Sequence, residues 1–340
     1  MASGVRPVRT RLQALLESFD PRVLQRTRQR VDDLRDSTRE LRRALDLIEI
    51  RTEQLMQLER LNWQQRGQLA RLPEVLASER VEAHVVAAVE RAKLVLDPFP
   101  HFIVEEWLPP DLYAAVIGAI PPPVFFAEKP SHKQQLAVPP PVAPELARQV
   151  WAFMAETVVA GALGPAVTRK LRGPLDAYVA TFCPDGAADW AQEAPIRVSD
   201  GRLMLRRPGY VLEPHRDPRW GFITCLAYLA RPGDVEAYGT RLYRVRNDGQ
   251  APDESVHYLQ PEDCELAGTV PFRANQLLVF LNSTGAHAAS IPADAPPATE
   301  RYLYQFRMGP DVAGIGWLLA QIPAEQRPHW AGLKAARAGY

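Results

Sequence analysis

The first part of the chain carries a seven-residue hydrophobic repeat. Apolar side chains recur at Leu34, Leu41, Ile48 and Leu55, and charged or polar residues fill most positions between them. Such a repeat with charged flanks is typical of a coiled coil, in which helices bury a shared apolar stripe. We therefore predict a long helix over residues 21–72 that forms a homodimer or binds a helical partner. The alternative is a helix that packs on its own domain.

Shorter elements follow this repeat. The segment Asp97-Pro98-Phe99-Pro100 interrupts the helical pattern, because proline cannot continue a helix. We therefore place a domain boundary between residues 96 and 97. The further helices and the first short strand are predicted over Glu74–Leu96, Leu108–Ile120, Glu145–Ala160, Ile315–Ile322 and, for the strand, Phe102–Val104.

From Leu203 onward, short β-type runs alternate with Gly, Pro and Asn. The predicted strands are Leu203–Arg207, Phe222–Leu229, Thr240–Val245, Cys264–Val270, Gln276–Leu281, Ala288–Ile291 and Tyr302–Phe306. Many short strands with such turns are typical of a sandwich or jelly roll. The prediction is an α+β protein: a helical or coiled-coil region over 1–96, a double-stranded β-helix (jelly roll) with supporting helices over 97–310, and a helical tail over 311–340.

Composition adds a few constraints. The 340 residues are 46% hydrophobic and 24% charged, as in a soluble globular protein. Forty basic residues balance forty acidic ones, so no overall field favours nucleic acid or membranes, and we expect neither as a partner. No segment reads as long enough to span a bilayer, and the start lacks the apolar run of a signal peptide. Three distant cysteines fit a reducing compartment, so we expect a cytoplasmic protein.

The candidate chemistry lies at His215-Arg216-Asp217 and at His287. Side chains at i and i+2 of a strand point to the same face, so His215 and Asp217 can reach one ion while Arg216 points away. A late strand of a jelly roll can bring His287 beside them. Two imidazoles and one carboxylate on one face of an iron form the 2-His-1-carboxylate triad of non-haem Fe(II) oxygenases.

Other interpretations of these residues exist. A His-x-Asp pair alone occurs often by chance. His257 is a rival ligand, although its neighbours Asp253 and Glu254 indicate a solvated loop. A hydrolase that uses His215 and Asp217 as an acid–base pair is a third interpretation, but no nucleophile elbow or second carboxylate supports it.

Three ordered segments carry a family resemblance. Residues 203–217 (LMLRRPGYVLEPHRD), residues 270–283 (VPFRANQLLVFLNS) and residues 97–110 (DPFPHFIVEEWLPP) resemble the Fe(II)/2-oxoglutarate oxygenases, in particular their prolyl-hydroxylase-like branch. The resemblance covers roughly residues 97–310 and does not include the seven-residue repeat.

The resemblance implies a ligand set and a co-substrate site. It implies that His215, Asp217 and His287 hold Fe(II), and that Arg301 grips the far carboxylate of 2-oxoglutarate, with Arg307 as the rival cation. Two tyrosines, Tyr210 and Tyr228, are candidates to line the co-substrate pocket, each with a core role as the alternative. O2 is the second co-substrate, and the resemblance leaves room for ascorbate.

The resemblance also implies a reaction. It is the hydroxylation of an unactivated C–H bond in a peptide, a protein side chain or a glycan-like small molecule, with succinate and CO2 as co-products. Halogenating relatives lack the metal-binding carboxylate, so Asp217 favours hydroxylation, while desaturation and ring closure stay open. The competing hypothesis is a coiled-coil scaffold protein whose jelly roll is inactive or serves as a sensor.

Overall fold

The structure is a computed structural model that describes residues 21–126, 130–185, 188–246, 257–282, 285–325 and 327. Its internal contacts divide the chain into two compact units, Met1–Met56 and Gln57–Tyr340. The helix α2 (Pro21–Gln64) makes up the described part of the first unit and continues into the second.

The α2 helix carries the seven-residue repeat on its surface. Leu34, Leu41, Ile48 and Leu55 are each between 61% and 66% exposed. The long helix is therefore confirmed, and its self-association stays a prediction.

The end of the predicted helix needs a correction. A turn at Gln65 separates α2 from α3 (Arg66–Val75), so the helix predicted over residues 21–72 is divided in two, and α3 continues past residue 72. Gly67 weakens the helix at this point because it loses more backbone freedom than other residues. The Gln65 side chain also donates a hydrogen bond to the Gly118 carbonyl, outside the helix.

The predicted boundary between residues 96 and 97 also differs from the structure. The α4 helix (Ser78–Arg91) buries Val81, Val85 and Val89 in the main core, which it shares with strands near the end of the chain. The hydrophobic contacts of α4 therefore make it part of the second unit. The other helices are α5 (Pro110–Gly118), η1 (Pro123–Phe125), α6 (Glu145–Phe153), η2 (Met154–Leu163), α7 (Gly164–Lys170), α8 (Arg172–Phe182), α9 (Trp190–Glu193), η3 (Glu236–Tyr238), η4 (Pro261–Asp263) and α10 (Val312–Gln321).

Two antiparallel sheets form the centre of the second unit. The six-stranded sheet contains, in spatial order, β1 (His101–Glu105), β9 (Gln276–Leu281), β5 (Ile223–Tyr228), β11 (Arg301–Pro310), β3 (Ile196–Arg206) and β2 (Lys133–Ala137). The five-stranded sheet contains β7 (His257–Tyr258), β4 (Val211–Arg216), β10 (Ala286–Ser290), β6 (Thr240–Val245) and β8 (Cys264–Val270). The mixed helix-and-sheet architecture predicted from the sequence is confirmed.

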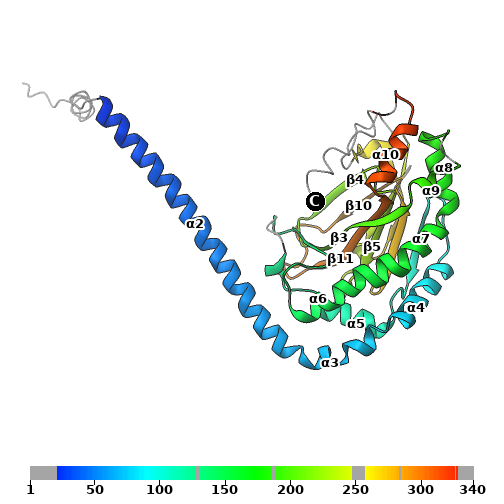
Figure 1. The fold of residues 1–340 in the computed structure, drawn as a ribbon, viewed down its shortest axis with the longest axis horizontal. Coiled ribbons are helices and arrows are strands. Elements are labelled where there is room, and N and C mark those ends of the chain that lie inside the picture. The colour runs from blue at the N-terminus through cyan, green and yellow to red at the C-terminus, as the bar shows by residue number, and fades with distance from the viewer. Residues whose placement is uncertain are drawn as a thin grey trace, which may run out of the picture. The chain divides into compact units, whose positions relative to one another are not determined.

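Strand alternation sorts the six-stranded sheet into two faces. In β5, Ile223 and Cys225 lie in the core that contains α4, α6 and α7, and these helices lie along one side of the strands (Figure 1). Leu226 and Tyr228 lie in a second cluster with Leu242 of the five-stranded sheet. The two sheets therefore pack face to face, and side chains between them are enclosed on both sides.

One helical stretch corrects the expectation that no segment could span a bilayer. The run Glu145–Lys170, made of α6, η2 and α7, is long and apolar enough by length and composition. In its apolar 18-residue window 56% of the residues are buried inside the protein, and Val150, Val158 and Val159 belong to the main core. A core helix of a soluble protein passes the same test, so this feature is weak evidence for a membrane segment.

Candidate metal centre

The pairing of two strands brings the predicted ligands together. In the register of β4 and β10, His287 lies directly opposite His215, and their ring centres are 4.1 Å apart. Asp217 follows the last residue of β4, and its Oδ1 is 3.9 Å from His215 Nε2. One ligand atom from each of the three buried side chains lies within 4.8 Å of the other two.

Hydrogen bonds orient these side chains. His215 Nδ1 lies 2.8 Å from the Glu213 carbonyl oxygen, so that nitrogen carries the proton and Nε2 is left free as a ligand atom. Thr224 donates its hydroxyl to Asp217 Oδ2 at 2.6 Å, and Arg307 Nη2 donates to Asp217 Oδ1 at 2.9 Å.

The backbone next to Asp217 is clamped by Asn282. The Asp217 N–H donates to Asn282 Oδ1, and the Asn282 amide nitrogen donates to the Asp217 carbonyl at 2.6 Å. The structure shows that Asn282 holds the ligand loop in place without contributing to the cluster itself.

Burial and neighbouring charges set the protonation of the cluster. Burial lowers the pKa of His215, and burial with the nearby His215 brings the pKa of His287 down to about 3. Burial raises the pKa of Asp217, but Arg307 and the two imidazoles outweigh it and leave the pKa lowered. Both rings are therefore neutral and the carboxylate is ionised at pH 7, which is the form that binds a metal.

The rival ligand His257 can be placed only by its backbone. His257 belongs to β7, next to Arg216 of β4, and its side chain lies outside the described residues. Within the described part of the chain, His215, Asp217 and His287 form the single group of three or more such side chains able to hold an ion.

Arg301 and Arg307 lie in different surroundings on β11. Arg307 is bonded to Asp217, as described above. Arg301 is only 3% exposed, makes no ion pair with a described residue, and places its guanidinium 5.5 Å from the ring centre of Tyr228 and 5.0 Å from that of Phe272. Burial lowers the pKa of Arg301, and its Nε lacks a hydrogen-bond partner among the described residues.

The two candidate tyrosines are both buried near Arg301. Tyr210 lines the cavity beside the metal cluster. Its electrostatic interaction with Arg301 raises the pKa of that arginine, whereas burial lowers it. Tyr228 donates its hydroxyl to Thr240 Oγ1 at 2.7 Å, and burial raises its pKa.

A cavity of about 170 Å³ lies between the two sheets beside the cluster. Its lining includes all three candidate ligands, both β11 arginines and Tyr210. It also includes Arg206 of β3, a buried side chain that the sequence reasoning missed. Arg206 lies opposite Arg301 in the pairing of β3 with β11. The sequence does not reveal this register, so it gave no reason to place Arg206 in the cavity.

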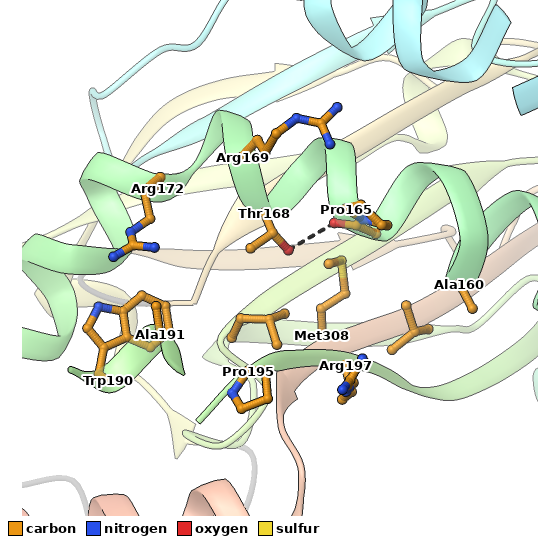
Figure 2. A pocket seen from close by; sticks show the side chains of 13 residues that line it. Ala160, Pro165, Thr168, Arg169, Arg172, Trp190, Ala191, Pro195, Arg197 and Met308 are labelled. Carbon is orange, nitrogen blue, oxygen red and sulfur yellow. Dashed lines mark hydrogen bonds between the residues drawn. The ribbon is translucent and has the colours of Figure 1, made fainter. Parts of the chain in front are cut away.

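A larger cavity of about 480 Å³ lies elsewhere, between α7, α9 and the start of β3 (Figure 2). Its lining is mainly apolar, with Arg169, Arg172 and Arg197 at its edges. No His, Asp, Glu or Cys is among the described residues that line it, so these residues offer no metal ligand or acid–base group. The candidate chemistry therefore belongs to the smaller cavity.

Comparison with known proteins gives structural matches only. No protein-family model matches the sequence, and no curated protein matches it. The crystal structure of a Pseudomonas putida prolyl-4-hydroxylase is similar in fold, with 16% identity, 67% of this chain and 99% of that chain covered, and a TM-score of 0.36.

Two further solved structures extend this comparison. HygX from Streptomyces hygroscopicus, with nickel and 2-oxoglutarate bound, is 13% identical over 62% of this chain and 83% of its own, with a TM-score of 0.36. The non-heme α-ketoglutarate-dependent epimerase SnoN from nogalamycin biosynthesis is 13% identical over 72% of this chain and 90% of its own, with a TM-score of 0.32. At these identities and TM-scores the likenesses say nothing of chemistry, which depends on the side chains of this chain.

Proposed function

We propose that this protein is an Fe(II)- and 2-oxoglutarate-dependent dioxygenase built on a double-stranded β-helix. The observation that carries the proposal is the buried cluster of His215, Asp217 and His287 beside a cavity that also holds Arg301, a cation with no acidic partner among the described residues. The reaction that fits is hydroxylation of a C–H bond in a peptide, protein side chain or glycan-like small molecule, with succinate and CO2 as co-products.

The donor set fits Fe(II). Two neutral imidazoles and one carboxylate are the ligands of the facial triad, which leaves positions on the metal for other molecules. No further Asp, Glu, His or Cys is found among the described residues that line the cavity. A fully enclosed structural metal site would need such a fourth protein ligand.

The residues around the cluster have separable tasks. When bound, Fe(II) supplies the redox chemistry that couples oxidative decarboxylation of 2-oxoglutarate by O2 to oxidation of the substrate. His215, Asp217 and His287 hold the ion, and Thr224 fixes the orientation of the Asp217 carboxylate. Arg301 is suited to the far carboxylate of 2-oxoglutarate because its planar fork can bind two carboxylate oxygens at once.

The choice between the two arginines favours Arg301. Arg307 already compensates Asp217, whereas Arg301 is buried without an acidic partner among the described residues. A buried cation that lacks a counter-charge is expected to receive one from a ligand. The ionised Asp217 favours hydroxylation over halogenation, because the carboxylate occupies the position that a halide would need.

The scaffold function remains the second candidate because of one observation, the exposed apolar row of α2. We propose that this row pairs two copies of the chain, and that such pairing accompanies the enzyme rather than replaces it. The scaffold hypothesis with an inert jelly roll does not explain why three convergent ligands and a buried cation lie in one cavity.

The decisive assay follows 2-oxoglutarate. Purified full-length protein should convert it to succinate when Fe(II) and O2 are supplied, and conversion should stop when a chelator removes the iron. Arg301→Gln should raise the 2-oxoglutarate concentration needed for half-maximal rate by at least about tenfold, which corresponds to losing one charge-assisted contact. Absence of succinate from wild-type protein that binds both Fe(II) and 2-oxoglutarate would overturn the proposal.

A further inference from the structure

The cavity contains a second buried guanidinium, that of Arg206. The side chain is 1% exposed, and its Nη1 donates to the carbonyl oxygens of Gln134 at 2.7 Å and Leu205 at 3.0 Å. Its Nε and Nη2 have no hydrogen-bond partner among the described residues. The guanidinium lies 4.9 Å from the ring centre of Tyr210, which covers it with a π-face but offers no acceptor there.

Arg206 and Arg301 are neighbours by strand register. They are directly opposite each other in the antiparallel pair of β3 and β11, so both side chains lie on the same face, toward the cavity. Two like charges in this arrangement repel each other, and burial strengthens the repulsion because water cannot screen it. The arrangement is stable only if nearby groups supply negative charge.

The carboxylates close to this pair are already engaged. Asp217 is bonded to Arg307 and Thr224. Glu300, the residue before Arg301, accepts hydrogen bonds from Arg207 and the Tyr302 hydroxyl and lies near Arg231.

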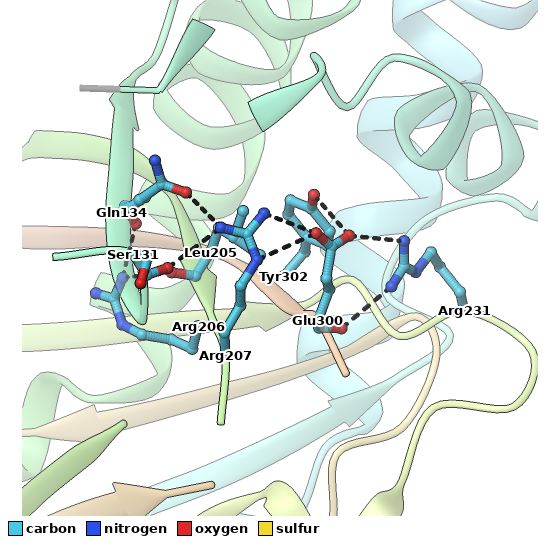
Figure 3. A network of polar contacts seen from close by, with 8 residues as sticks. All are labelled: Ser131, Gln134, Leu205, Arg206, Arg207, Arg231, Glu300 and Tyr302. Atoms are coloured by element: carbon cyan, nitrogen blue, oxygen red, sulfur yellow. Dashed lines mark hydrogen bonds and ion pairs between the residues drawn. The ribbon is translucent and has the colours of Figure 1, made fainter. Parts of the chain in front are cut away.

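Figure 3 shows that Glu300 sits within this group of partners, whereas Arg206 turns away from it toward Gln134. Among the described residues that line the cavity, Asp217 is the sole acid, against the cations Arg206, Arg301, Arg307, Arg202 and Lys133.

We infer that Arg206 is a second anion-binding residue, which acts together with Arg301 on a small dicarboxylate in this cavity. The carboxylate of the ligand would supply the acceptor that Nε and Nη2 lack and would relieve the repulsion between the two arginines. This inference rests on the proposed function in naming 2-oxoglutarate as that dicarboxylate. It adds a residue that selects doubly charged 2-oxo acids over singly charged ones.

A purely structural role for Arg206 is the competing explanation. Its Nη1 bonds join β3 to Gln134 of β2, and they could be the whole purpose of the side chain. Such a role would affect unfolding but would not change which anion binds. The test therefore needs a measurement of ligand preference beside a measurement of stability.

Calorimetric titration of full-length protein loaded with redox-inert Zn(II) measures ligand preference, and thermal unfolding of the same protein measures stability. We expect wild type to prefer 2-oxoglutarate over the monocarboxylate 2-oxobutyrate, and Arg206→Gln to weaken 2-oxoglutarate binding at least tenfold, or about 1.4 kcal/mol. The affinity for 2-oxobutyrate should change much less, so that the preference shrinks. Arg197→Gln, an exposed arginine of the same strand at the edge of the other cavity, should leave both affinities unchanged.

Arg206→Lys keeps the charge but loses the fork, and it decides the question if Arg206→Gln does not fold. A folded Lys variant with weaker 2-oxoglutarate binding and an unchanged unfolding temperature supports the inference. If a folded Gln or Lys variant prefers 2-oxoglutarate over 2-oxobutyrate as strongly as wild type does, the inference is overturned. Arg206 is then left with its structural role. Because these measurements need no turnover, protein that shows the Arg206-dependent preference but makes no succinate would contradict the proposed function alone.

Discussion

The carboxylate of Asp217 is the residue on which the centre depends most. It is 4% exposed, yet both of its oxygens have a donor, from Thr224 on one side and Arg307 on the other. An ionised carboxylate at this depth costs several kcal/mol unless its charge is compensated. Arg307 provides that compensation in the metal-free protein, and a bound divalent ion would take over part of it.

This exchange of partners can be measured with Arg307→Gln. We expect the substitution to lower the stability of metal-free protein by about 3 kcal/mol, because it leaves the Asp217 charge buried without its cation. Zn(II) should restore most of the loss, which thermal unfolding with and without the ion would report. Arg241→Gln, a half-buried arginine that bonds the Ser290 hydroxyl, serves as the control. An equal loss of stability with and without Zn(II) would contradict the idea that a bound ion takes over the role of Arg307 beside Asp217.

At the scale of elements, the junction that leads into β10 decides where His287 lies. Gly285 lies directly before β10 and against the Phe99 ring, because an added Cβ would come within 1.6 Å of a ring atom of Phe99. Phe99 packs edge-on against Phe280, whose ring centre is 4.7 Å from that of His287. The contacts of Phe99 with Phe280, and of Phe280 with His287, thus help to hold β10 in place.

Gly285→Ala tests this support. The added methyl must displace Phe99 or β10, so we expect a loss of stability of about 1–3 kcal/mol, as in other overpacked cores. Metal affinity should fall as well, since His287 is two residues away on the displaced strand. Gly268→Ala in β8 is the matched control, because nothing lies within 4 Å of its added Cβ. Calorimetric metal titration of both variants would show the difference, and equal affinities would disprove the link to His287.

The elements also show what could be predicted from the sequence. The spacing of His215 and Asp217 predicted their proximity because side chains two apart on a strand share a face, although β4 ends at Arg216, directly before Asp217. Strand lengths were less certain: β3 begins at Ile196 and β10 at Ala286, earlier than predicted, and β2 was missed. Pairing register depends on contacts across the whole sheet, so the position of Arg206 opposite Arg301 had no local signal.

At the scale of the whole molecule, α2 leaves a row of large apolar side chains in water. Exposed apolar surface of this extent is typical of an interaction site. Because the seven-residue spacing keeps the row on one side of α2, the row is suited to packing against a partner helix, parallel or antiparallel, rather than against a globular surface. The partner that the chain itself can offer is a second copy of α2.

Sedimentation would test this pairing in the full-length chain. We expect wild type to be a dimer and Leu41→Glu combined with Ile48→Glu to be a monomer, because charge in the stripe opposes its burial. Leu47→Glu changes an exposed leucine outside the seven-residue row, 55% exposed against 66% for Leu41, and should leave the dimer intact. A monomeric wild type at micromolar concentration would remove the idea of self-association without affecting the metal centre.

Anaerobic calorimetric titration of Fe(II) tests the central claim most directly, that His215, Asp217 and His287 form one metal centre. Wild type should bind one ion per chain, and His215→Ala, Asp217→Ala and His287→Ala should each lose most of that affinity while a folded state is verified by thermal unfolding. Fe(II) binding that survives unchanged in the folded His215→Ala and Asp217→Ala variants would contradict the proposed centre.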